Sequence, residues 1–417
     1  MRSALILAGL CAGLAAARAF ADDDDALRLA DHTPFASTEK APVHVFTEAG
    51  LERDVGPGQV RSGVLGVDLR GQLDGPQGWH LDFSDRLDAK QPFNESGSGQ
   101  QANSLRELYV SGTLTPSWLV EFGRMNIRNG VAQGYSPSDF FKPHALRAVL
   151  SYDPNELRAN RLGVVGAKTE WFSDTSAASL LVAPRLRNAD QTGALAADFG
   201  AVNREGQALL TWTQALTSDI KPQAAVYVEE HHAPQWSLQA TTLLNQQLVA
   251  YAEWSGGHAR TMEQEALMLP STGSFVHRST VGATWTFPDK LSLTGEYSHN
   301  GAGFDAQGWK QLESLGAPAV GAVLLWADDA QDPPSRDNLY WQARWEDAPV
   351  DRVDLSAYLR QSLAERSHQA WIEVRYRDRS RNEFYLQWLA NGGPQGSVYG
   401  SVPTRQIFTL VWRHDFS

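Results

Sequence analysis

Three short stretches of the sequence contain residue types that could take part in catalysis or metal binding. In residues 296–303 (EYSHNGAG) a serine lies next to a histidine, and a histidine base can activate a serine nucleophile. The residue that shares a strand face with His299, two positions later, is Gly301, whereas Ser298 lies on the opposite face. The first stretch therefore predicts no catalytic residues.

The other two stretches are incomplete as metal sites. Residues 229–232 (EEHH) offer carboxylate and imidazole ligands, but the ligands are adjacent and lack the spaced partner that metal sites use. Residues 328–337 (DDAQDPPSRD) lack the glycine and the ligand spacing of a calcium loop. We expect no metal and no cofactor, and we interpret EEHH as part of a solvated loop.

The first 21 residues have the pattern of a secretory signal peptide. A basic residue near the start is followed by an apolar centre and by small residues at Ala19 and Ala21. Cys11 is the only cysteine and lies in this segment, so the mature chain would have none. Loss of two arginines changes the formal charge from −12 to −12 − 2 = −14. An exported, acidic chain without disulfides is typical of a bacterial envelope protein and is not expected to bind nucleic acid.

Apolar and polar residues alternate with a period of two along the mature chain. Residues 64–73 (VLGVDLRGQL) and 291–298 (LSLTGEYS) place apolar side chains on one strand face and polar ones on the other. A soluble periplasmic β-protein could contain a few such strands. Here charged residues occupy one face in strand after strand, and aromatic residues lie at the ends of the other. This pattern favours a transmembrane β-barrel with lipid outside and a polar lumen inside.

Short polar turns alternate with longer connecting segments. The short turns are residues 115–118, 217–219, 287–290, 346–349 and 377–382. The longer segments are residues 91–103, 129–160, 187–203, 256–274, 300–337 and 391–404. Outer-membrane barrels alternate short periplasmic turns with long outer loops. We therefore expect an all-β fold in which residues 22–42 form a periplasmic arm and residues 43–417 an antiparallel up-and-down barrel. The expected number of strands is about 18, with 16 as the alternative, and the last strand pairs with the first.

Two segments carry a resemblance to a known class of proteins. The last strand, residues 405–417 (RQIFTLVWRHDFS), alternates regularly and ends on Phe416, followed only by Ser417. Residues 123–141 (GRMNIRNGVAQGYSPSDFF) lead from a Gly-Arg strand end into a Pro-x-Asp-aromatic turn. The chain resembles the Gram-negative outer-membrane β-barrels, and within them the porin-like and alginate-export-like barrels. The resemblance implies that the barrel-assembly machinery recognises the last strand, and it assigns no substrate.

The long segment after residue 128 is rich in charged residues and is predicted to fold into the barrel. Strict alternation would turn Arg124 and Arg128 towards lipid, whereas a bulge at Gly123 would turn both into the lumen. Charged residues of this region that could line a constriction are Arg124, Arg128, Asp139, Lys142 and Arg147. The alternative is a solvated outer loop whose charges bind lipopolysaccharide. A possible helix at residues 308–326 would form a lid over the mouth or pack on the rim.

Inward-facing charges are distributed unevenly around the predicted barrel. Basic candidates on the late strands are Arg344, Arg360, Arg375 and Arg413. Acidic candidates on the middle strands are Glu229, Glu253 and Glu296. Two such walls would create a transverse electric field that orients dipolar solutes and favours anions near the arginines. Alternatively, interleaved acids pair with these arginines and the charges stabilise the wall.

These observations predict a passive outer-membrane channel for small polar or anionic solutes, or for a polyanionic polysaccharide. It would contact outer-membrane lipid and lipopolysaccharide and carry out no bond chemistry. One alternative is a structural or surface-interaction barrel whose lumen is plugged by its long loops. A less favoured alternative is an outer-membrane lipid hydrolase, because the serine position of that pattern is occupied by Gly301.

Overall fold

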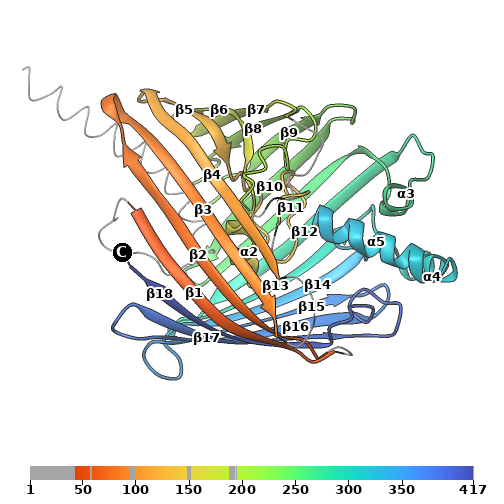
Figure 1. Cartoon of the computed structure of the whole chain (residues 1–417). Helices are drawn as coiled ribbons and strands as arrows, with labels where there is room; N and C mark the ends of the chain where they lie inside the picture. The colour runs from red at the N-terminus through yellow and green to blue at the C-terminus, as the bar shows by residue number, and fades with distance from the viewer. Residues whose placement is uncertain are drawn as a thin grey trace, which may run out of the picture.

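The computed structural model describes residues 43–56, 59–93, 99–147, 152–186, 193 and 195–416. The predicted signal peptide (1–21) and periplasmic arm (22–42) lie outside the described residues. Eighteen strands form a single sheet in which each strand pairs antiparallel with its neighbours in sequence. β1 also pairs with β18, so the sheet closes into a barrel (Figure 1). The expected up-and-down barrel of 18 strands is confirmed, and the alternative of 16 is wrong.

The strands differ in length around the barrel. Their bounds are β1 Val43–Asp54, β2 Arg61–Asp74, β3 Trp79–Pro92, β4 Gln100–Thr115, β5 Trp118–Met125, β6 Val164–Phe172, β7 Ser176–Ala183, β8 Gln207–Gln214, β9 Gln223–Glu229, β10 Gln235–Asn245, β11 Leu248–Ala259, β12 Ser274–Thr286, β13 Leu291–Asn300, β14 Asp337–Trp345, β15 Val353–Ser362, β16 Ser367–Arg377, β17 Asn382–Gly392 and β18 Gln406–Asp415. β5 to β9 are short strands of 7 to 9 residues. Every other strand is longer, except for β14, which also has 9 residues.

The period-two alternation separates an apolar outer face from a polar inner face. On β2, Leu65, Val67 and Leu69 are exposed on the outer face, whereas Asp68 between them is fully buried on the inner face. On β18, Phe408, Leu410 and Trp412 are exposed in the same way. Exposed apolar side chains are stable there because the surrounding solvent is lipid, and closure leaves no unpaired strand edge in it.

Short turns and long loops alternate between the two ends of the barrel as predicted. Residues 126–163, 184–206, 260–273, 301–336 and 393–405 connect strands at the end of the long loops. The expectation of a long loop at residues 91–103 is wrong, because β3 continues to Pro92 and β4 begins at Gln100. The polar residues at the ends of β3 and β4 pair through their backbones. Backbone pairing does not need apolar side chains, so a polar sequence can still form strand.

Short helices occur in the loops. They are the 3₁₀ helix η1 (Pro76–Gly78), α2 (Pro154–Ala159), α3 (Met262–Ala266), α4 (Ala306–Ser314) and α5 (Ala317–Ala330). The single helix expected at residues 308–326 is instead two helices, because Gly316 adopts a left-handed φ of 96° between them. Trp309, Leu312 and Val323 of this pair bury their side chains against Met262 of α3 at the end of the long loops (Figure 1). Among the described residues, no helix is long and apolar enough to cross a membrane.

The seam between the first and last strands closes the barrel. Nine residue pairs, from Phe46↔Asp415 to Asp54↔Ile407, join β1 to β18. Beyond them the Phe416 N–H donates to the Val45 carbonyl at 2.9 Å, while the Phe416 ring remains 59% exposed on the outer face. Phe416 therefore fixes the seam through its backbone and contacts the membrane interface through its ring.

Replacement of Phe416 by Asp should reduce insertion into the outer membrane. The change places a charge where an interfacial aromatic residue belongs, and charges on the lipid face destabilise a barrel by roughly 1 kcal/mol or less near the interface and more with depth. The measurement is the amount of heat-modifiable barrel in outer-membrane fractions, with Phe416→Tyr as the matched control. Normal levels of the aspartate variant would contradict this role of the last strand.

Candidate functional site in the barrel interior

The loop between β5 and β6 (residues 126–163) folds into the barrel interior. Its first segment, residues 131–141, contacts β10 to β13. Its second segment, residues 152–161, contains α2 and contacts β4, β14 and β18. The loop thus crosses the lumen in two segments that contact opposite parts of the wall, and the predicted inward-folded loop is confirmed.

The first segment is held by the carboxylate of Glu253 on β11. The backbone N–H groups of Val131 and Ala132 donate to one of its oxygens. The hydroxyls of Ser136 and Ser138 donate to the other, at 2.8 and 2.6 Å. Glu253 is 2% exposed, so its charge is stabilised by the loop rather than by water. Hydrogen bonds to an ionised acceptor are stronger than those between neutral groups.

Glu296 on β13 holds the next residues of the same segment. The backbone N–H groups of Gln133 and Gly134 donate to its two oxygens at 2.6 and 2.8 Å. The Tyr251 hydroxyl donates to Glu296 as well. Together the two carboxylates satisfy four consecutive backbone donors of a segment that contains no helix or strand.

Two glycines allow this close approach of the loop to the wall. Gly130 has a left-handed φ of 99°, and a Cβ there would lie 1.8 Å from Ser136 Oγ. A Cβ on Gly134 would lie 2.6 Å from Cγ of Tyr340. Larger residues would therefore displace the loop from the carboxylates.

The second segment is held by arginines of the opposite wall. Arg344 of β14 donates to both carboxylate oxygens of Asp153, at 2.8 and 3.1 Å. Asp153 also caps α2 (Pro154–Ala159), and Glu156 in the first turn of α2 pairs with Arg413 of β18 at 3.2 Å. The loop acids thus neutralise two of the arginines that were predicted to form a basic wall.

Ion pairs within the wall neutralise further arginines. Arg106 of β4 donates to Asn160 at 2.7 Å and pairs with the fully buried Asp68 at 2.7 Å. Arg375 pairs with Glu383 at 2.7 Å, and Arg413 also pairs with Glu48. Interleaved acids therefore balance much of the positive charge, as the alternative interpretation of the sequence expected.

The two segments of the loop are also joined to each other and to the outer helices. Asp139 pairs with Arg161, and both side chains are buried. Lys142 pairs at 2.8 Å with Asp332, which follows α5. Burial would raise the pKa of Asp332, but the opposing charges of Lys142 and Arg278 outweigh it and hold this pKa below its ordinary value. The carboxylate is therefore ionised at neutral pH and joins the α5 loop to the inward loop.

The apolar part of the loop packs on the short strands. Phe141 lies in a buried cluster with Leu181 of β7 and Leu209 of β8. Phe140 stacks on Tyr227 of β9 at 4.8 Å between ring centroids. This contact fills the interior next to β7, β8 and β9, where the facing residues Leu181, Leu209 and Tyr227 carry no charge.

Arg124 and Arg128, which were expected to lie together, have different environments. The strand register runs without a bulge through Gly123, so Arg124 shares the face of the exposed Phe122. Its guanidinium is buried and donates to the carbonyls of Gly163, Ala197 and Asp198. The predicted bulge is therefore wrong, and the 184–206 loop covers Arg124 instead.

Arg128 lies beyond the strand and is exposed. It is within electrostatic range of the inward-facing Glu107 and of Arg161. Arg147 donates to the carbonyls of Asn103 and Ala196 and holds the inward loop to the rim. Of the three arginines, only Arg128 presents its charge to water.

Two predicted residues lie apart from these contacts. Arg360 of β15 faces the interior between the rings of Tyr340 and Tyr358, with its guanidinium 5.8 and 4.9 Å from the ring centroids. Glu229 is at the rim end of β9 and pairs with His232 at 3.5 Å. Ser298 and His299 lie on opposite faces of β13, and the His299 ring hydrogen-bonds to Asp337.

Sequence reasoning missed the partners that hold the loop. Asp153, Glu156 and Arg161 bind the wall or the loop itself, and none of them is among the residues predicted to line the constriction. The Asp-Pro-Asn-Glu sequence at residues 153–156 is a helix start signal and could have located α2. The wall partners could not be assigned, because they are separated from the loop by up to 257 residues.

Comparison with known proteins gives matches of structure but not of sequence. No protein-family model and no curated protein matches the chain. The crystal structure of Pseudomonas aeruginosa OccD3 (OpdP) matches with a TM-score of 0.51 at 12% identity, covering 90% of this chain and 91% of that chain. P. aeruginosa OccK5 (OpdH) matches with a TM-score of 0.54 at 9% identity, covering 89% and 97%. Acinetobacter baumannii OccAB1 matches with a TM-score of 0.53 at 7% identity, covering 89% and 95%.

These matches establish the fold. The chain is similar to the Occ structures over nearly its whole described length, and the predicted resemblance to porin-like outer-membrane barrels is confirmed at this level. A closed antiparallel barrel with an apolar outer face and an ion-paired interior belongs in the outer membrane. The predicted location is confirmed as well.

Replacement of both Glu253 and Glu296 by Gln should release residues 131–138 from the wall. Each charge-assisted hydrogen bond that is lost removes about 1.5–3 kcal/mol of stabilisation from the loop. The NH₂ group of each new glutamine side chain also cannot accept a hydrogen bond from the backbone N–H groups of the loop. Single-channel conductance should rise while the heat-modifiable barrel remains. Glu313→Gln on the exposed surface of α4 makes the same chemical change and should leave conductance unaltered. Unchanged conductance in the double variant would show that these carboxylates do not hold the constriction.

Arg124→Glu should change the stability of the barrel, whereas Arg128→Glu should change its ion selectivity. The first leaves buried carbonyls unpaired at about 1–3 kcal/mol each, so it should lower the unfolding temperature. The second reverses an exposed charge near the constriction, so it should shift the reversal potential towards cation selectivity without loss of stability. Thermal gel shift and bilayer recording measure the two effects. A selectivity shift from Arg124→Glu in a fully stable barrel would contradict the assigned outer position.

Proposed function

We propose that this protein is an outer-membrane channel for small polar solutes, with a preference for anions. A barrel of 18 strands encloses more space than its own wall side chains fill, and here an inward loop narrows it. Where α2 meets the wall beside Arg86 and Arg413, the remaining gap is about 20 Å³, near the space that one water needs. A lumen narrowed by such close contacts would favour small solutes over a polysaccharide chain.

The preference for anions rests on Arg360. Most interior arginines named above pair with a carboxylate, whereas Arg360 makes no ion pair and no hydrogen bond among the described residues; its contacts are the rings of Tyr340 and Tyr358. At close range its charge is therefore balanced by aromatic faces, which attract a cation weakly compared with a carboxylate, and Glu296 acts on it only from beyond ion-pair distance. An anion in the lumen would gain a hydrogen-bonded partner there without displacing a protein group.

The neighbouring groups support binding of a carboxylate or a similar anion. Tyr340 lies directly opposite Arg360 in the sheet, and its buried hydroxyl has no hydrogen-bond partner in the described part of the chain. The same holds for the side-chain N–H groups of Gln342 and Trp371 on the adjacent positions. A set of donors with few acceptors is suited to an anionic group, and the aromatic rings suit an apolar or planar remainder of the solute.

Arg360→Gln should reduce the ratio of anion to cation permeability. A tenfold change in this ratio corresponds to about 1.4 kcal/mol, within the range of one partly screened charge. The measurement is the reversal potential of the purified protein in a planar bilayer under a salt gradient. Arg379→Gln removes the same charge from an exposed turn at the other end of the barrel and serves as the control.

The second candidate is the plugged surface barrel, and the double crossing of the lumen by the loop favours it. The two functions differ in conductance. If neither the wild-type protein nor the Glu253→Gln, Glu296→Gln variant conducts, the channel proposal is wrong. If the wild type conducts and Arg360→Gln leaves the permeability ratio unaltered, conduction stands and the anion preference is wrong.

A further inference from the structure

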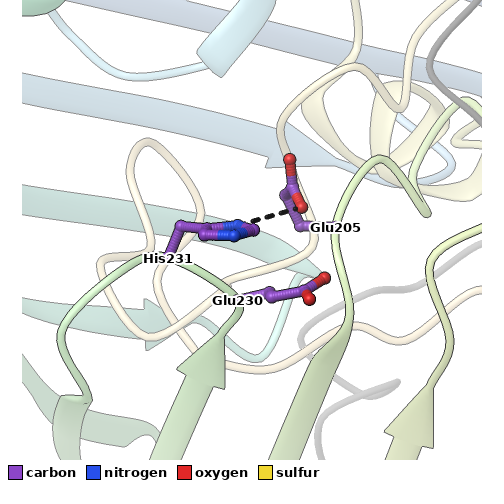
Figure 2. Close-up of side chains that lie close together, drawn as sticks. All are labelled: Glu205, Glu230 and His231. Atoms are coloured by element: carbon purple, nitrogen blue, oxygen red, sulfur yellow. Dashed lines mark ion pairs between the residues drawn. The ribbon is translucent and has the colours of Figure 1, made fainter.

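The structure brings together three possible metal ligands at the rim, outside the lumen. Glu205 precedes β8, and Glu230 and His231 follow β9, so the ends of two paired strands present them (Figure 2). One ligand atom from each residue lies within 4.8 Å of the others. The adjacent ligands of the EEHH sequence lacked a spaced partner, and Glu205 supplies it.

The backbone holds these residues in place. The Glu230 N–H donates to the Gly206 carbonyl at 2.8 Å, and the Gly206 N–H donates to Glu230 Oε2 at 3.3 Å. His231 adopts a left-handed φ of 66°, which turns its ring back towards Glu205. In Figure 2 the His231 ring and the Glu205 carboxylate face each other, with Glu230 alongside. The arrangement is thus an extension of the β8–β9 ladder and not a chance contact of long side chains.

One carboxylate oxygen of Glu205 retains acceptor capacity for a ligand. The Glu205 side chain is 27% exposed, and its Oε2 makes two ion pairs but accepts no hydrogen bond among the described residues. The charges nearest to it are His231 Nδ1 at 3.5 Å and an Arg185 guanidinium nitrogen at 3.3 Å, both beyond strong hydrogen-bond geometry. From this geometry we propose that Glu205, Glu230 and His231 bind a divalent transition-metal ion, with Zn²⁺ as the preferred ion.

The donor set determines the class of ion. Zn²⁺ is bound in proteins by histidine nitrogen and carboxylate oxygen, and three protein ligands leave a position for water. Ca²⁺ and Mg²⁺ require six or more oxygen ligands and do not favour imidazole. Two carboxylates and a neutral imidazole carry a charge of −2, which a divalent ion balances. Arg185 then acts on Glu205 as an outer partner, as is usual for ligating carboxylates.

The site would join the 184–206 loop to the β9–β10 turn. The same loop provides the carbonyls that hold Arg124 and Arg147. A bound ion would therefore stabilise the rim next to the root of the inward loop. The 68% exposed side chain of His231 gives the ion direct access from the outside.

Zn²⁺ binding to the full-length barrel, purified without a polyhistidine tag, tests this inference. Isothermal titration should give one site per chain, and Co²⁺ as a probe should give the visible absorption of a low-coordinate site. Glu205→Gln, Glu230→Gln and His231→Ala should each weaken Zn²⁺ binding by about tenfold or more. His232→Ala removes the neighbouring histidine, which is not one of the three ligands, and should retain the affinity. A large excess of Ca²⁺ should not displace Zn²⁺.

Several results would overturn the inference. These are no saturable Zn²⁺ binding by the wild type, equal affinity in the three ligand variants, or a loss in His232→Ala as large as in His231→Ala. Heat modifiability on gels shows whether each variant forms a barrel. Glu230 and His231 are exposed, so their variants should fold even if Glu205→Gln does not. The test does not depend on conduction and stands apart from the proposed channel function.

Discussion

The barrel interior depends on the need to satisfy the backbone of a loop that lies away from bulk water. A buried N–H group without a partner costs about 1–3 kcal/mol, and four in succession would expel the loop. Glu253 and Glu296 accept hydrogen bonds from these four groups, from Val131 to Gly134. The same bonds stabilise the two buried carboxylates. The wall thus offsets the desolvation cost of the loop N–H groups, and the loop offsets the desolvation cost of the wall carboxylates.

This mutual dependence explains the distribution of charge around the wall. The acidic strands bind loop donors, and the basic strands bind loop acids such as Asp153 and Glu156. The acidic and the basic wall therefore bind two segments of the same loop. The charges of the loop partly neutralise the electric field across the lumen. What remains for a passing solute is charge that no carboxylate pairs directly, and Arg360 of the wall is a described interior residue with this property.

The rim links these interior contacts to the outer surface. The 184–206 loop covers Arg124 and contacts Arg147, and the α5 loop reaches Lys142 through Asp332. Both outer loops thus contact the middle of the inward loop, one at Arg147 and the other at Lys142. Their stability influences the constriction because a loop that is fixed at its middle has fewer conformations available to it.

Local patterns in the sequence are sufficient to predict the architecture. Alternation on strands such as β2 and β18 predicts two different environments, and the order of turns and loops predicts the number of strands, because both signals are local and repeat along the chain. The sequence also located the inward loop through its charges and identified Glu253, Glu296, Arg344 and Arg413 as inward-facing.

The contacts of these residues follow from the folded barrel and not from local sequence patterns. Whether Arg124 points to the lumen or to the outside depended on a bulge, and one extra residue reverses every side chain of a strand. Whether EEHH has a further carboxylate beside it depends on strand pairing, which places Glu205 there. The pairing of α2 with β14 and β18 is fixed by barrel closure over a long sequence separation, and no local pattern in the sequence encodes it.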